Sequence, residues 1–521
     1  MLGPIFNREC LTVPRRAQHY ISRAVYLGIL WILALTAWQT SVGWSKTATL
    51  YETGRFGPLL FRLAVVVQLV LLIFFAALTS AGAITQEKDR RTFILLLLTD
   101  LRNYEIVLGK LLGALLPILL FLLGSLPFLL FITLLGGVAP SQVVLAILIL
   151  ACTSLVAASL GTVMALWRDK TFQALALTVL LLVLYFCLVR GLPAILGVFG
   201  TVQNLDTIEY WQTCLDPFLA LESLQQPPNP DVMITPGVGF IGMMLLFSIL
   251  LNAWSLRKLR VWNPSGEPIQ QREQPDPEAE EKAERARDIH AAPGKVREVG
   301  ENPILWREVF TRAYGRRPLL VKGAYFIVFG LVCYYALAPL IQGEEAPKFA
   351  AAYGLVPIGI LSMLLVAAQA ATAITSERDL GSLDLLLVTD LSPKEVIFGK
   401  LWGILYNSKE YLIPPLILVG VYAWFGLLAT PPADQPELRR ALGFEALVCL
   451  LGIGLVLMAF TIVLGIHVAL RVPNSRQAIL STLSTIFFLS VGTLVCIYLI
   501  LINGRFEYQW TSFLVFAIAG V

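Results

Sequence analysis

Charged residues are scarce in this 521-residue sequence, where Asp, Glu, Lys and Arg together make up only 14%. Globular proteins average roughly 25%. Because 57% of the residues are hydrophobic, a soluble fold of this size could not shield so much apolar surface from water. The composition excludes a soluble enzyme, a nucleic-acid-binding protein and a disordered chain. It predicts an all-α polytopic membrane protein.

Histidine and paired cysteines are also scarce. Three histidines, seven cysteines and no CxxC motif give no basis for a metal site or a disulfide framework. The phosphate-binding loop GxxxxGK[ST] is absent as well. Gly109-Lys110 and Gly399-Lys400 lack its upstream glycine, and leucine follows each lysine. Without that loop, the chain is not expected to bind or hydrolyse ATP.

Long apolar segments dominate what is present. A helix needs about 20 apolar residues to span a membrane. Eleven segments qualify: 24–44, 58–83, 106–135, 142–166, 172–200, 236–256, 323–341, 349–374, 396–428, 442–470 and 477–502. Prolines lie inside two of them, at Pro117 and Pro127 and at Pro414 and Pro415. These two long segments are predicted to kink, tilt or partly re-enter.

The distribution of basic residues predicts the orientation. With a cytoplasmic N-terminus, 28 of the 39 Lys and Arg residues fall in cytoplasmic segments and six in external loops. The external loop 201–235 contains none. The positive-inside rule therefore places the N-terminus and the charged linker in the cytoplasm. We expect a multi-pass protein of the cytoplasmic membrane of a bacterium.

The sequence repeats itself internally. Residues 83–113 align with 373–403 at an offset of 290, with 16 of 31 positions identical. Both copies begin on the same side of the membrane, which indicates parallel halves related by an axis along the membrane normal. The predicted division is a first half, 1–256, a linker, 257–301, and a second half, 302–521. The second half ends before a sixth span, so we expect its last helix to be missing.

Each half begins with an amphipathic segment. In the second copy, Leu305 and Val309 share an apolar face, with charged residues opposite. Asn302 and Pro303 favour a helix start. The charged residues of the two copies are Arg8, Glu9, Arg307 and Glu308. The pattern is typical of a helix lying in the cytoplasmic interface; an extension of the first span is the alternative.

The cytoplasmic loops after the second span of each half, 84–105 and 375–395, are the most informative segments. Each has a charged start and then an apolar run too short to span the membrane. The run either docks on a partner or packs under its own bundle. Ser392, Pro393 and Glu395 form a capping box that starts a new helix. The candidate residues are Glu87, Asp89, Thr99, Asp100, Glu105, Glu377, Arg378, Asp379, Thr389, Asp390 and Glu395.

This loop resembles that of ABC-2 type transporter permeases. The resemblance rests on Glu377-Arg378, Gly381-Ser382-Leu383, Thr389, Ser392, Glu395-Val396 and Gly399-Lys400. The second copy departs from the family pattern at Asp390, where the family usually has proline. In the first copy, Arg91 replaces the glycine and Arg102 the serine. The resemblance covers nearly the whole chain and implies two fused six-span halves of an ATP-driven exporter.

The resemblance also implies partners. The two loops would be coupling helices that bind a cytosolic ABC ATPase subunit in two copies. ATP and Mg²⁺ would bind that subunit, leaving no cofactor in this chain. The alternative is that the loop charges only anchor helix ends at lipid headgroups. Membrane lipids are the other expected partner, and nucleic acid is not one.

Polar residues inside the spans are candidates for a substrate path. They are Gln68, Gln369, Asn407, Lys409 and Glu410. Interhelical hydrogen bonding or snorkelling is the alternative role. A secondary transporter of the major-facilitator type is the competing function, although Gly82 and Asp89-Arg90-Arg91 imitate its loop motif only loosely. A scaffold or membrane enzyme is a third class, and the sequence does not identify the substrate.

Overall fold

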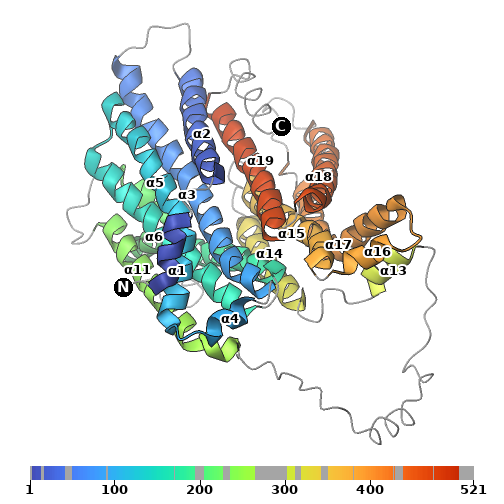
Figure 1. Cartoon of the computed structure of the whole chain (residues 1–521). Helices are drawn as coiled ribbons and strands as arrows, with labels where there is room; N and C mark the ends of the chain where they lie inside the picture. The colour runs from blue at the N-terminus through green and yellow to red at the C-terminus, as the bar shows by residue number, and fades with distance from the viewer. Residues whose placement is uncertain are drawn as a thin grey trace, which may run out of the picture.

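The computed structural model describes fourteen ranges of the chain: 3–12, 17–41, 50–89, 92–168, 171–193, 205–226, 235–263, 302–310, 318–341, 350–379, 381–425, 427–428, 438–472 and 475–503. Within these ranges the regular secondary structure is entirely α-helical (Figure 1). The predicted all-α class is confirmed. Residues 264–301 of the predicted linker and the end of the second half, 504–521, lie outside the described residues.

Two series of helices follow one another along the chain. The first contains α1 (Gly3–Thr12), α2 (Ala17–Ser41), α3 (Leu50–Asp89), α4 (Thr92–Leu98), α5 (Asn103–Leu135), α6 (Pro140–Trp167), α7 (Thr171–Arg190), α9 (Leu205–Leu215), α10 (Pro217–Ser223) and α11 (Pro236–Trp262). The second contains α13 (Pro303–Phe310), α14 (Pro318–Ile341), α15 (Ala350–Asp379), α16 (Ser382–Leu387), α17 (Pro393–Trp424), α18 (Leu438–Arg471) and α19 (Ser475–Asn503). Helix α11 continues past the boundary predicted at residue 256.

Ten of the described helices are long and apolar enough to cross a membrane. They correspond to ten of the eleven predicted spans. The eleventh, 396–428, falls mostly in α17, which ends at Trp424. This helix is continuous but is not one of the ten, since the polar stretch 407–410 interrupts its apolar sequence. Both α5 and α17 run through their prolines as single helices of 33 and 32 residues. At 1.5 Å per residue each is about 50 Å long, which exceeds the hydrocarbon core.

One long helix lies at the centre of each series. Helix α3 packs against α5, α6 and α7, and α15 packs against α17, α18 and α19. Small residues allow close approach at these interfaces. The Ser80 hydroxyl contacts Ala158 O and Thr162 Oγ1 at 2.7 Å each. In the second series, a Cβ built on Gly465 would lie 2.5 Å from the Cβ of Ala370.

The two series meet in two places, one at α7 and the other at α19. Helix α7 packs against α14, and α19 packs against α2 and α3. The rings of Phe74 and Phe487 stack with centroids 3.8 Å apart. Gly191, just after α7, lies directly against the ring and hydroxyl of Tyr335 of α14. The contact between the series is therefore made largely of apolar and aromatic groups.

The predicted external loop 201–235 contains two short helices, α9 and α10, which the sequence analysis missed. Asp216 caps α10 by accepting from the backbone N–H of Phe218 at 2.8 Å. Burial raises the pKa of Asp216, and the Arg190 guanidinium, 2.5 Å away, opposes that shift. The Tyr185 hydroxyl donates to Leu215 O at 2.7 Å. These contacts fasten the external helices to the end of α7.

Candidate functional site

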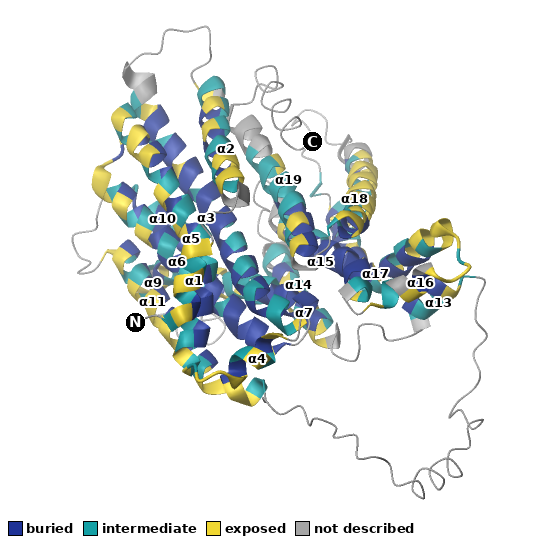
Figure 2. Cartoon of the chain, in the orientation of Figure 1, coloured by how far each residue is buried: buried dark blue, intermediate teal, exposed yellow. Residues whose placement is uncertain are grey.

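The short helix α4 follows the long helix α3 after a break and has two unlike faces. Phe93 and Leu97 are buried against the bundle, whereas Leu95 and Leu98 are exposed. Figure 2 shows both kinds of position on α4. One face of this apolar run therefore packs under its own bundle while the other is open.

Helix α16 has the same character. Leu386 is buried, but Leu385 is 73% exposed and Val388, just after the helix, is 87% exposed. At the 290-residue offset, Leu385 corresponds to Leu95 and Val388 to Leu98. The sequence left packing and docking open, and the structure supplies a packed face and an exposed face in both copies.

Threonine and aspartate follow each short helix. The hydroxyls of Thr99 and Thr389 donate to the carbonyls of Leu96 and Leu386, each at 2.6 Å. The next residue, Asp100 or Asp390, is exposed. We call Leu95, Leu98 and Asp100 the first outer face, and Leu385, Val388 and Asp390 the second outer face. Each outer face combines two apolar side chains with one carboxylate.

Gly381 forms the turn between α15 and α16. Its φ is +70° and its backbone N–H donates to Arg378 O at 3.0 Å. This left-handed conformation is readily adopted by glycine and disfavoured for residues with a Cβ. Gly381, which matches the ABC-2 pattern, therefore allows the backbone to turn between the two helices. Its counterpart, Arg91, lies outside the described residues.

The predicted capping box of α17 is confirmed. Ser392 Oγ accepts from the backbone N–H of Glu395, and Glu395 Oε2 accepts from the backbone N–H of Ser392 at 2.9 Å. The backbone N–H and the hydroxyl of Ser392 both donate to the Glu395 carboxylate and lower its pKa. In α5, Glu105 Oε2 accepts from the N–H of Arg102 at 2.9 Å. Glu105 and Glu395 therefore both cap the N-terminus of the helix that follows their loop.

A cluster of four charged residues lies behind the second loop. We call Arg307, Glu308, Glu377 and Lys400 the charged junction. Lys400 Nζ lies 2.5 Å from Glu308 Oε1 and 2.6 Å from Glu377 Oε1, and the Lys400 and Glu308 side chains are only 3% and 4% exposed. Arg307 also pairs with Glu377. The junction thereby ties α13, the end of α15 and α17 together.

The equivalent junction of the first series is looser. Lys110 pairs with Glu87, but Glu9 pairs with its neighbour Arg8 at 2.9 Å. The Glu9 side chain is 23% exposed, against 4% for Glu308 at the matching position. Within the described residues, the first series has an ion pair where the second has a three-helix cluster.

The interfacial-helix prediction is wrong about one face of α13. Glu308 was expected opposite the apolar face, yet Ile304 and Glu308 are the buried residues, packed against α17. A Cβ built on Gly403 would lie 2.6 Å from the Cβ of Glu308. Gly113 of α5 stands in the same relation to Glu9. Lys400 pairs with Glu308 there. Because Lys400 belongs to α17, the pattern of α13 alone does not indicate this partner.

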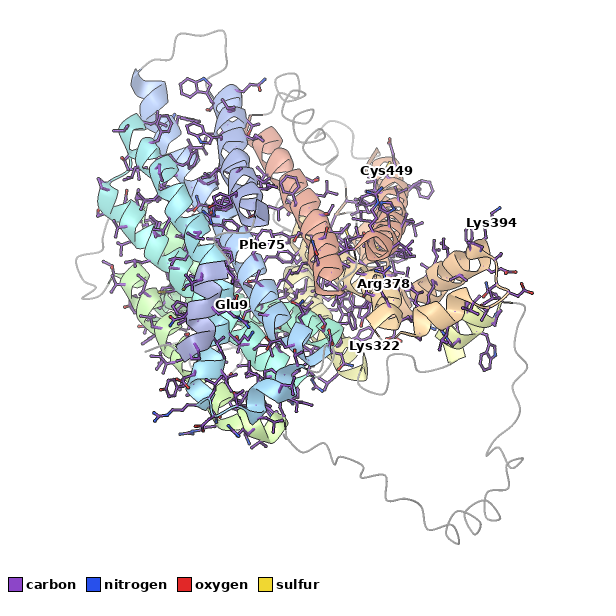
Figure 3. The ribbon with its side chains drawn as sticks, in the orientation of Figure 1. Glu9, Phe75, Lys322, Arg378, Lys394 and Cys449 are labelled. Atoms are coloured by element: carbon purple, nitrogen blue, oxygen red, sulfur yellow. The ribbon has the colours of Figure 1, made fainter. Side chains whose placement is uncertain are left out.

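The basic residue that ends each long central helix caps another helix. Lys88 Nζ donates to Leu166 O at 2.7 Å and to Arg168 O at 3.0 Å. Arg378, marked in Figure 3, donates to Ala469 O at 2.9 Å and Val472 O at 2.7 Å. These bonds satisfy carbonyls left free at the C-termini of α6 and α18.

The candidate residues of the two loops therefore fall into two groups. Glu87, Glu377 and Arg378 contact the chain's own helices, and Asp89 accepts from the Thr171 hydroxyl. The residues at the exposed surface are Thr99, Asp100, Thr389, Asp390 and Glu395. The side chain of Asp379 lies outside the described residues.

The predicted substrate-path residues do not converge on one site. Gln68 Oε1 accepts from Ser125 at 3.4 Å, and Gln369 Oε1 accepts from Ser408 at 3.0 Å. Asn407 donates to Glu308 O at 3.1 Å, Lys409 lies over the Tyr406 ring, and Glu410 pairs with Lys322 at 2.7 Å. Every one of these contacts stays within one helix series. Four of the five contacts join two helices, whereas that of Lys409 with Tyr406 lies within α17, and a role in a substrate path stays a prediction.

Comparison with protein families provides an independent observation. Residues 41–257 match the model of a family described as ABC-2 family transporter protein. This part of the chain, less than half of its length, is similar to the ABC-2 family. The match supports a membrane subunit of an ABC transporter, and the ten long apolar helices support a chain that crosses the membrane several times.

No curated protein matches the chain. Among the described residues, no group of three or more His, Cys, Asp or Glu side chains is arranged to hold a metal ion.

Proposed function

We propose that this chain is the fused permease of an ATP-driven exporter in a bacterial cytoplasmic membrane, with a cytoplasmic N-terminus. In this proposal it comprises two parallel ABC-2 halves joined by the linker 257–301. Support comes from the matching order of α1–α7 and α13–α19 and from the shared packing of α1 on α5 and α13 on α17. Orientation rests on the distribution of Lys and Arg.

Coupling to ATP hydrolysis is assigned to α4 and α16. Each would insert its outer face into a groove of one of two cytosolic ABC ATPase subunits, which bind ATP and Mg²⁺. The observation that carries this proposal is the exposure of a matching apolar pair, Leu95 with Leu98 and Leu385 with Val388, at the same positions of both loops. Exposed apolar side chains beside a carboxylate suit a protein interface better than the lipid headgroups alone.

The buried residues behind these faces would transmit the motion. Force on α16 reaches Glu377 through the short turn at Gly381, and Glu377 contacts Lys400 of α17. Lys400 in turn holds Glu308 of α13. A rigid ion cluster of this kind moves as a unit, because separating its members would leave a charge buried without a partner. The second half would therefore transmit displacement more directly than the first.

Co-purification tests the proposal. The full chain is expressed with the ATPase from its native source, and the ATP-hydrolysing subunit retained on the tagged permease is quantified. Leu385→Asp with Val388→Asp should abolish most retention, since two charges would enter an apolar groove. Leu11→Asp, at a similarly exposed leucine of α1, should retain the subunit.

The same experiment can reject the proposal. Unchanged retention by the double variant would show that the second outer face is not the docking surface. Absence of any P-loop ATPase on the native permease, together with transport that resists ATP depletion, would reject the ATP-driven class. Size-exclusion profiles matching the native protein are required of both variants.

A further inference from the structure

The exposed side of α11 changes character along its length. Leu246 and Leu250 are exposed on its apolar part, followed by exposed Trp254. Arg257 and Lys258 continue the same side toward the end of the helix and are also exposed. The spacing of three or four residues keeps these positions on one face. The face therefore runs from aliphatic to aromatic to basic residues.

That order matches the depth profile of one membrane leaflet. Helix α11 is one of the ten spanning helices and ends at Trp262. Arg257 lies about 8 Å along the axis from that end. Tryptophan favours the headgroup level, and basic side chains reach from apolar surroundings toward the polar region. Where α11 spans the membrane, this order would bring the exposed Arg257 and Lys258 to headgroup depth.

A second helix brings another cation to the same place. Asn103, the first residue of α5, accepts from Arg260 Nε at 3.0 Å and donates to Leu256 O at 3.4 Å. Its neighbour Arg102 is exposed at the start of α5. The positive end of the α5 dipole also points here, where it favours an anion. Asn103 therefore fixes the start of α5 beside the last turns of α11.

The patch is basic on balance. We call Arg102, Arg257, Lys258 and Arg260 the basic patch. None of its four side chains forms an ion pair with a described residue. Two acidic residues, Asp100 and Glu105, lie close to Arg102 in the sequence. The Glu105 carboxylate accepts from the Arg102 backbone N–H, so it is already engaged.

We propose that the basic patch binds the phosphate headgroup of an anionic phospholipid. The lipid-facing position supplies the acyl chains with an apolar surface at Leu250 and Trp254, and two helices supply the cations. At the corresponding start of α17, Ser392 stands at the position of Arg102. The segment Ser392-Pro393-Lys394 contains a single cation, Lys394. Within the described residues, the basic patch therefore lies in the first series, at the start of α5 and the end of α11.

The experiment measures bound lipid directly. The full chain is purified in detergent, incubated with phosphatidylglycerol or phosphatidylcholine, and examined by native mass spectrometry. Phosphatidylglycerol should bind with clear preference, and the preference should fall at high salt. Neutralising one cation weakens such binding about fivefold, so Arg257→Gln with Lys258→Gln should weaken it about 25-fold.

Two further variants serve as controls. Lys394→Gln removes an exposed cation at the start of α17 (Figure 3) and should bind phosphatidylglycerol like the native chain. Arg257→Lys with Lys258→Arg preserves both charges and should retain most of the binding, which separates lost charge from lost folding.

Three results would overturn the proposal. One is equal binding of the two lipids to the native chain. Another is phosphatidylglycerol binding by the double Gln variant that equals that of the native chain. The proposal is overturned in the same way if this variant binds the lipid normally but loses a protein that co-purifies with the native chain. The third is competition by inorganic phosphate at the concentration of the lipid, which would assign the patch to a free anion.

Discussion

Replacing Lys400 by methionine is the most direct test of the charged junction. Methionine keeps the length of the side chain but removes the cation that lies 2.5 Å from Glu308 and 2.6 Å from Glu377. Glu377 retains Arg307. Glu308 is left with the same arginine at 3.6 Å. One carboxylate, 4% exposed, therefore loses its close partner.

The size of the effect follows from burial. Removing one member of a buried ion pair costs about 3 to 5 kcal/mol, and we expect the lower end, about 3 kcal/mol, because Arg307 remains. The matched variant is Lys110→Met. Its partner Glu87 is 22% exposed and can recover water contacts, so the expected loss is about 1 to 2 kcal/mol. We therefore predict that both variants are less stable than the native chain and that Lys400→Met loses more stability than Lys110→Met.

The assay is denaturant unfolding of the detergent-solubilised chain, followed by tryptophan fluorescence. Glu308→Gln in the Lys400→Met background should restore part of the stability, since the unpaired charge is then removed. The reasoning is refuted if Lys400→Met is no less stable than Lys110→Met, or if adding Glu308→Gln lowers stability further.

Three further outcomes are expected. Gly403→Ala should release α13 from α17, measured as faster hydrogen exchange in 303–310, because the new Cβ would meet Glu308 at 2.6 Å, whereas Gly420→Ala, with nothing within 4 Å, should not. Gly191→Ala should loosen the contact between the helix series, lowering the yield of a disulfide engineered across it, since its Cβ would collide with Tyr335. Acidification should fray the start of α17: the pKa of Glu395 is lowered in the fold, so its stabilising effect is present above the unfolded pKa and lost as pH falls through the folded one. Exchange at 393–396 should show this in the native chain and not in Glu395→Gln.

The sequence alone predicted the features that depend on local pattern. Apolar runs of about 20 residues located ten spanning helices. The Ser392 to Glu395 spacing located the start of α17, and it did so because a capping box is complete within four residues. The repeated loops also pointed to the family whose model matches residues 41–257. Each of these inferences needs only neighbours in the chain.

The features it missed depend on distant partners. A helical wheel placed Glu308 on the polar side of α13, but Lys400, 92 residues away, lets it be buried. Helices α9 and α10 lie in a segment that was predicted only as an external loop, although the Asp216 cap and Arg190 hold them against α7. The candidate path residues were grouped because they are polar within apolar segments. Their contacts lie on several different helices, and their role in a substrate path stays a prediction.

Composition and periodicity determined that this chain is a helical membrane protein, where its helices lie and which loops repeat. These properties follow from the free energy of placing each segment in lipid, which is a sum over local residues. Only the tertiary structure decided which charges are buried, which face of each loop helix is exposed and that the start of α5 lies beside the last turns of α11. Those outcomes depend on partners brought together from separate helices, and a buried charge is stable only where such a partner lies within a few ångströms.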